Sequence, residues 1–130
     1  MRPNDTYLII DDDDIDKMIV QRMMQRVRPG LEQREMADGK EALSYLEDCL
    51  KERDVPRFIL LDLVMPLWDG FMFLERYMER IYPSIPDVPI VILSSSVHGR
   101  DREKCLEYPF VKEYMLKPFS KDAFMELNIS

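Results

Sequence analysis

Four short, mostly apolar stretches of this sequence each end in side chains that can bind a cation or an anion. Acidic residues follow two of the stretches, hydroxyl residues follow the third and a lysine follows the fourth. The pairs are Tyr7–Ile10 with Asp11–Asp14, Arg57–Leu61 with Asp62, Ile90–Leu93 with Ser94–Ser96, and Val111–Leu116 with Lys117. Parallel strands of one sheet place such residues along the same edge, so these groups are expected to converge.

Asp11, Asp12 and Asp62 are the candidate metal ligands. Each comes directly after a strand that is expected to be buried, where an unpaired carboxylate is costly and a hard divalent cation would compensate for it. Mg²⁺ prefers oxygen ligands in an octahedron, so carboxylates, a backbone carbonyl and a phosphoryl oxygen would suit it. The single histidine and the two cysteines form no cluster that would favour zinc. Asp13 and Asp14 are expected to favour the start of the following helix instead.

The elements that must position these residues alternate between strand and helix patterns, which is typical of βαβ units around a parallel sheet. The expected strands are Tyr7–Ile10, Glu32–Met36, Arg57–Leu61, Ile90–Leu93 and Val111–Leu116. The helices are marked by Ile15, Met18, Ile19, Met23 and Val27; by Ala42, Leu43, Leu46 and Leu50; by Phe71, Leu74, Tyr77, Met78 and Ile81; and by residues Arg100–Tyr108 and Ser120–Leu127. We therefore expect an α/β fold with a doubly wound parallel sheet of five strands, whose ligands bind beyond the carboxyl ends of the strands.

Composition limits the classes of protein that fit. A chain of 130 residues with 46% hydrophobic content suits one compact domain, expected over residues 1–130. The net charge of −7 argues against direct nucleic-acid binding. The apolar runs are too short to cross a membrane, so a soluble, cytoplasmic protein is expected. Cys49 and Cys105 have no Cys or His neighbours and are interpreted as reduced structural thiols.

The segment Leu60–Gly70 contains the pattern D-x-x-M-P-x-x-D-G from Asp62 onward. In this pattern the chain resembles response regulator receiver domains of two-component signalling, in particular the single-domain chemotaxis type. The acidic pair Asp11-Asp12, the segment Asp38–Leu43, the hydroxyl of Ser94 and the segment Tyr114–Phe119 are also similar to the family, in the family's order. The resemblance covers nearly the whole chain and implies a flavodoxin-like sheet with strand order 2-1-3-4-5.

The resemblance implies a role for each of these residues. Asp62 would accept a phosphoryl group as a carboxylate nucleophile. Asp12, Asp62 and the backbone carbonyl of Val64 would hold Mg²⁺ directly, and Asp11 would assist through water. Lys117 would pair with the phosphoryl group and Ser94 would donate a hydrogen bond to it. The family also implies a cis peptide bond between Lys117 and Pro118.

The partners follow from the same resemblance. The phosphoryl donor would be a histidine kinase or a histidine phosphotransfer protein, and the chain would act as a signalling receiver, not as an enzyme with turnover. Tyr114 resembles the family's switch aromatic, whose ring moves as Ser94 shifts toward the phosphate. The output protein would then read the surface formed by Arg100–Tyr108, Val111–Leu116 and Ser120–Leu127.

Two alternatives from other classes remain at this point. A haloacid-dehalogenase-like phosphatase also uses a nucleophilic aspartate, and Asp12–Asp14 fits the start of its motif, although the chain has no room for a cap domain. A pseudo-receiver would dock partners without phosphorylation, although the acidic pair, Asp62 and Lys117 argue against it. Incubation with a small phosphodonor separates the three hypotheses. A phosphatase would release phosphate continuously, a pseudo-receiver would not react, and a receiver would form a stable aspartyl phosphate.

Overall fold

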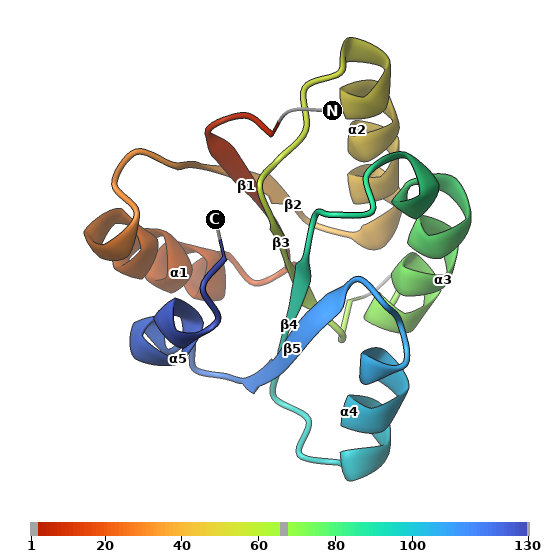
Figure 1. Ribbon diagram of the computed structural model, residues 1–130. Helices are drawn as coiled ribbons and strands as arrows, with labels where there is room; N and C mark the ends of the chain where they lie inside the picture. Colours follow the sequence, from red (N-terminus) through yellow and green to blue (C-terminus); the bar gives the residue numbers. More distant parts are fainter. Residues whose placement is uncertain (1–2, 66–67, 130) are drawn as a thin grey trace.

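The computed structural model describes residues 3–65 and 68–129, and its centre is a sheet of five parallel strands (Figure 1). The strand order is β2-β1-β3-β4-β5, as the resemblance implies. The strands are β1 (Thr6–Ile10), β2 (Glu32–Met36), β3 (Ile59–Asp62), β4 (Ile90–Ser94) and β5 (Val111–Leu116). The helices are α1 (Asp14–Val27), α2 (Gly39–Glu52), α3 (Gly70–Arg80), α4 (Gly99–Leu106) and α5 (Lys121–Glu126), with the short 3-10 helix η1 at Tyr82–Ser84.

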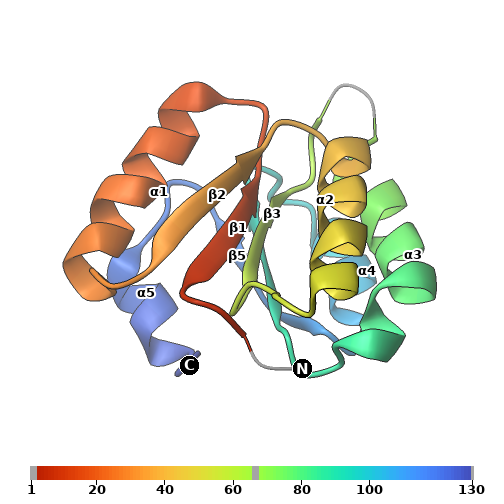
Figure 2. The same cartoon turned by 90° about the horizontal axis from the view of Figure 1, so that it is seen from above.

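Helices cover both faces of this sheet, with α1 and α5 on one face and α2, α3 and α4 on the other (Figure 2). Because side chains alternate along a strand, β1 contributes Leu8 and Ile10 to the core under α2 and α3, and Tyr7 and Ile9 to the core under α1 and α5. All five residues of β1 are buried. Burial on both faces explains the continuous apolar character of the central strands and confirms the expected α/β fold class.

Only some of the apolar residues that mark α1 in the sequence pack against the sheet, among them Met23 and Val27. Ile15 and Met18 are 64% and 43% exposed, whereas Val20 and Met24 are buried against the sheet. Both sets of residues satisfy the spacing of three to four residues that marks one side of a helix. The expected helix is confirmed, but apolar side chains occur on two sides of α1, and spacing alone does not show which of them is buried.

Aspartate side chains begin three of the helices. Asp13, Asp38 and Asp69 each accept hydrogen bonds from backbone N–H groups of the first turn of α1, α2 and α3, respectively. A carboxylate at this position satisfies free N–H groups and interacts favourably with the helix dipole. The expectation that Asp13 favours the start of a helix is confirmed, and Asp14 lies in the first turn of the same helix.

Other predictions can be compared directly with the structure. The peptide bond between Lys117 and Pro118 is cis, as the resemblance implies. Cys49 and Cys105 are both buried and unpaired. Within the described residues, no helix has the length and apolar character needed to cross a bilayer. Pro66 and Leu67, which belong to the motif that follows Asp62, lie outside the described residues.

Gly70 allows the loop after β3 to close tightly onto α3. A Cβ atom at this position would lie 2.6 Å from the side chain of Leu63, 2.7 Å from the Cα atom of Leu63 and 3.0 Å from the carbonyl oxygen of Asp62. The N–H group of Gly70 also donates to the carbonyl of Leu63 at 2.8 Å. The backbone beside Asp62 is therefore fixed by a contact that only glycine permits.

We predict that Gly70→Ala lowers the free energy of unfolding by about 1–3 kcal/mol, because the added methyl group overlaps backbone atoms that cannot move freely. Urea denaturation measures the effect. Gly99→Ala is the matched control, since Gly99 is also the first residue of a helix and a Cβ atom there would have no other atom within 4 Å. Equal stability of the two variants would contradict the close packing assigned to Gly70.

Candidate functional site

The candidate site lies at the carboxyl ends of the four strands that the sequence singles out. Asp11 follows β1, Asp62 ends β3, Ser94 ends β4 and Lys117 follows β5. The N–H group of Lys117 donates to the carbonyl of Ser94 at 2.8 Å, so the backbones of the last two strands remain joined up to the site. The parallel register thus brings together residues that are more than 100 positions apart in the sequence.

Asp11, Asp12 and Asp62 form the acidic part of the site. Each offers one carboxylate oxygen, and these three oxygens lie within 4.8 Å of one another. Asp11 and Asp62 are buried, while Asp12 is exposed. An all-oxygen set that faces solvent on one side fits Mg²⁺, which binds few protein ligands and keeps several water molecules. The donor chemistry thus agrees with the metal expected from the sequence.

Lys117 supplies the positive charge of the site. Its Nζ atom donates to Asp16 Oδ2 at 2.8 Å and to Asp11 Oδ2 at 3.1 Å, and it lies 3.7 Å from Asp62 Oδ2. The contacts with Asp11 and Asp62 are those that converging strand ends predict. Asp16 was missed, because it lies in the first turn of α1 and its spacing from the other acidic residues carried no distinct signal.

Burial dominates the electrostatics of the carboxylates. It raises the pKa of Asp62 to about 6, since the charge of Lys117 lowers the pKa by less than desolvation raises it, and the charges of Asp11 and Asp12 add to the increase. Burial also raises the pKa of Asp11. For Lys117, burial would lower the pKa, but the hydrogen bond to Asp16 and the charges of Asp62 and Asp11 raise it above its ordinary value. The ammonium group therefore stays charged.

Val64 lies beside Asp62 with its side chain in solvent. Its N–H group donates to Asp62 Oδ1 at 3.3 Å, and its side chain is 66% exposed. The N–H contact orients the carboxylate of Asp62 from the side of the loop. The expected role of the Val64 carbonyl as a metal ligand stays a prediction.

Ser94 is fully buried and belongs to a chain of contacts that leads away from the site. Its Oγ atom accepts from the N–H group of Ser96 at 3.0 Å. The hydroxyl of Ser96 donates to Asp101 of α4 at 2.6 Å, and the hydroxyl of Tyr114 donates to the Ser96 carbonyl at 3.0 Å. Tyr114 is 6% exposed, so its ring is buried in this structure. The loop after β4 therefore links the site to α4 and β5.

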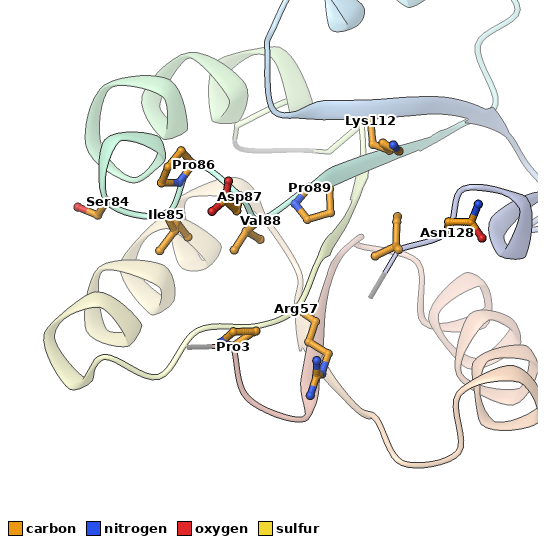
Figure 3. A pocket seen from close by; sticks show the side chains of 11 residues that line it. Pro3, Arg57, Ser84, Ile85, Pro86, Asp87, Val88, Pro89, Lys112 and Asn128 are labelled. Atoms are coloured by element: carbon orange, nitrogen blue, oxygen red, sulfur yellow. The ribbon is translucent and has the colours of Figure 1, made fainter. Parts of the chain in front are cut away.

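A separate cavity of about 410 Å³ lies at the other end of the sheet (Figure 3). Arg57 and Pro89 precede β3 and β4, and Lys112 lies near the start of β5, so this cavity is at the amino ends of the strands. It is far from the carboxylates that end the same strands and is not part of the candidate site.

Known proteins resemble this chain over most of its length. A family model described as "Response regulator receiver domain" matches residues 7–128. The sensor histidine kinase CheAY of Helicobacter pylori is 31% identical over 113 residues, which are 87% of this chain but only 13% of that protein. The chain thus corresponds to a small part of that relative's length.

Solved structures agree with this match. A two-component response regulator from Cytophaga hutchinsonii has a TM-score of 0.87 and 26% identity, over 98% of this chain and 96% of that chain. The Mn²⁺-bound form of response regulator Rcp1 has a TM-score of 0.76 and 27% identity, over 95% of this chain and 89% of that chain. A metal ion is thus present in a protein to which this chain is similar.

The raised pKa of Asp62 predicts how stability depends on pH. The folded pKa of about 6 exceeds the ordinary value of 3.8, so folding disfavours the charged form. Below pH 4 the group is protonated in both states and no cost arises. As the pH rises from about 4 to about 6 the cost appears, and above pH 6 it is complete, on the order of 3 kcal/mol.

We therefore predict that Asp62→Asn unfolds at higher urea concentration than the parent at pH 7.5 without divalent cations. The difference should shrink at pH 5, where the parent carboxyl is largely protonated. Asp48→Asn is the control, because Asp48 is an exposed residue of α2. A stability difference between Asp62→Asn and the parent that does not change with pH would contradict the assigned pKa.

Proposed function

Since this chain belongs to the family of response regulator receiver domains, we propose that it accepts a phosphoryl group on Asp62 in a reaction that depends on Mg²⁺. One observation carries the proposal: a buried carboxylate at the end of β3 lies beside two further carboxylates and one ammonium group. A receiver domain is a signalling module, and this site has the groups that reversible phosphorylation requires.

In the proposed reaction an Asp62 carboxylate oxygen attacks the phosphorus atom of the donor, and the P–N bond of a phosphohistidine or the P–O bond of acetyl phosphate breaks. The new P–O bond makes Asp62 an acyl phosphate, and the leaving group takes the electron pair of the broken bond. Lys117 pairs with a phosphoryl oxygen, and the Ser94 hydroxyl donates to another.

Asp12, Asp62 and the carbonyl of Val64 would hold the Mg²⁺ ion directly, and Asp11 would assist through water. When bound, this ion neutralises the carboxylates and the phosphoryl oxygens between which charge moves during transfer. The similarity to the Mn²⁺-bound structure of Rcp1 supports a divalent cation at this place. Asp62 must also lose its proton before it can act as a nucleophile, which a nearby divalent charge favours.

The proposed phosphoryl donor is a histidine kinase or a histidine phosphotransfer protein, and the proposed output surface is formed by α4, β5 and α5. A groove of about 450 Å³ lies on this surface, between Arg102 on α4 and Leu127 at the end of α5. Two apolar side chains, Leu116 and Met125, are 51% and 56% exposed on β5 and α5. Such side chains beside a groove suit a partner that binds by apolar contacts.

The proposed switch runs from Ser94 to this surface. A movement of Ser94 toward the phosphoryl group would displace Ser96, whose N–H group is bonded to the Ser94 hydroxyl. Ser96 in turn contacts both Tyr114 and Asp101, so the same movement reaches β5 and α4. The switch role of Tyr114 rests on this hydrogen-bonded connection.

The family membership speaks against a haloacid-dehalogenase-like phosphatase, while the phosphate-independent pseudo-receiver stays the alternative. The charged groups of the site favour the hypothesis of a receiver that is phosphorylated. A docking module without chemistry gains nothing from two buried carboxylates, whose burial is costly.

We predict that acetyl phosphate with Mg²⁺ labels the parent protein with one acid-labile phosphate, and that Asp62→Asn is not labelled, because an amide is a poor nucleophile. Asp12→Ala should reduce Mg²⁺ affinity at least tenfold, since it removes a charged ligand. Phosphate analysis and calorimetric titration with Mg²⁺ measure the two effects.

Asp48→Asn serves as the control and should be labelled like the parent. Full labelling of Asp62→Asn would place the acceptor elsewhere. Absence of labelling in the parent would favour the pseudo-receiver, and continuous release of phosphate would favour a phosphatase.

We further predict that the phosphorylated protein loses its phosphate slowly. Hydrolysis needs a water molecule aligned with the phosphorus atom, and a polar side chain nearby can orient it. The side chain of Val64 offers no hydrogen bond, and the hydroxyl of Ser96 is already donated to Asp101. Val64→Asn combined with Ser96→Glu should speed the decay several-fold, as an order-of-magnitude expectation.

The decay is measured after the phosphodonor is removed, with Mg²⁺ present. The single variant Val64→Asn separates the effect of this position from that of Ser96. Equal decay rates in the double variant and the parent would show that these two positions do not set the lifetime.

A further inference from the structure

Asp16 makes the shortest contact of the Lys117 ammonium group, although it belongs to neither the acidic triad nor the motif around Asp62. The distance from Lys117 Nζ is 2.8 Å to Asp16, against 3.1 Å to Asp11 and 3.7 Å to Asp62. Asp16 lies in the first turn of α1, and its side chain is 34% exposed. The three carboxylates thus reach Lys117 from α1, from the end of β1 and from the end of β3.

The three contacts of Lys117 differ in what happens to them when a metal ion binds. Asp11 and Asp62 belong to the group of oxygens within 4.8 Å that suits a divalent cation, and Asp16 does not. A divalent cation at the triad would compete with Lys117 for Asp11 and Asp62. The carboxylate of Asp16, which is not a ligand of the cation, then remains as the partner of the Lys117 ammonium group.

An unanchored lysine would be poorly suited to the proposed reaction. A lysine side chain has many rotamers, and this conformational freedom is lost when its ammonium group is fixed on a phosphoryl oxygen. An ammonium group has three donors, and in this structure two of them are used by Asp16 and Asp11. Retaining the bond to Asp16 while the bond to Asp11 is exchanged would keep the side chain ordered during the change of partner.

We propose that Asp16 is a positioning residue, which anchors the Lys117 ammonium group beside Asp62 while Lys117 exchanges Asp11 for the phosphoryl group. The proposal rests on the proposed function of Asp62 and adds a residue of α1 to its machinery. Asp16 does not touch the phosphoryl group and acts only through Lys117.

The direction in which the affinity for beryllofluoride changes shows whether Asp16 anchors Lys117 or only adds negative charge to the site. Beryllofluoride binds to aspartates as a mimic of a phosphoryl group, and it is an anion. Removal of a nearby carboxylate would tighten its binding if only repulsion mattered. Loss of the anchor would weaken its binding, because Lys117 would no longer be held in place.

The experiment is titration of the full chain with beryllofluoride in the presence of saturating Mg²⁺. Asp16→Asn should weaken binding roughly fivefold, the effect expected for loss of a partly exposed ion pair. Asp16→Glu keeps the charge on α1 and should recover most of the affinity. Asp14→Asn is the matched control, because Asp14 lies in the same turn, is 96% exposed in its side chain and contacts Lys17 instead.

Melting curves of all variants show whether each remains folded. Unchanged or tighter binding by Asp16→Asn would overturn the anchor, as would equal weakening by Asp14→Asn. A parent protein that binds no beryllofluoride would instead contradict the proposed function of Asp62. The failure of the anchor and the failure of the phosphoacceptor can therefore be told apart.

Discussion

The burial of negative charge at one edge of the sheet is the constraint on which this structure depends. Asp11 and Asp62 are 1% and 6% exposed, and both contribute oxygens to a group within 4.8 Å. Two like charges about 5 Å apart repel by roughly 3 kcal/mol at the effective dielectric of a protein. Lys117 offsets part of this repulsion, but burial still raises the pKa of both carboxyl groups. The remaining negative charge makes the site attractive to a divalent cation.

The strands and the loops that follow them hold these charged side chains in place. The parallel strands β1, β3, β4 and β5 have their carboxyl ends at the same edge of the sheet, and a residue of the site ends or directly follows each of them. Gly70 closes the loop after β3 against the Asp62 carbonyl, and Ser94 connects the end of β4 to Ser96 and onward to Tyr114. The backbone beside the acceptor is thus closely packed against Gly70, and the other side of the site is linked through Ser96 to α4 and β5.

The sequence was sufficient to predict the fold class and the residues that converge, because strand ends and acidic residues have clear local signals. Asp11, Asp62, Ser94 and Lys117 were each predicted from the end of an apolar run. The partner of Lys117 on α1 could not be predicted in the same way. Whether Asp16 reaches Lys117 depends on the rotation of α1 about its axis, and the apolar residues of α1 point to two different faces. The contacts of Ser96 likewise depend on the path of a loop and not on a pattern.

The most direct test of the account is to locate the acyl phosphate in the parent protein. Borohydride reduces an aspartyl phosphate to homoserine, and mass spectrometry of the peptides then identifies the converted position. After treatment with acetyl phosphate and Mg²⁺, the account predicts homoserine at position 62 alone and none when Mg²⁺ is withheld. Conversion at another acidic residue, or conversion that does not depend on Mg²⁺, would contradict it.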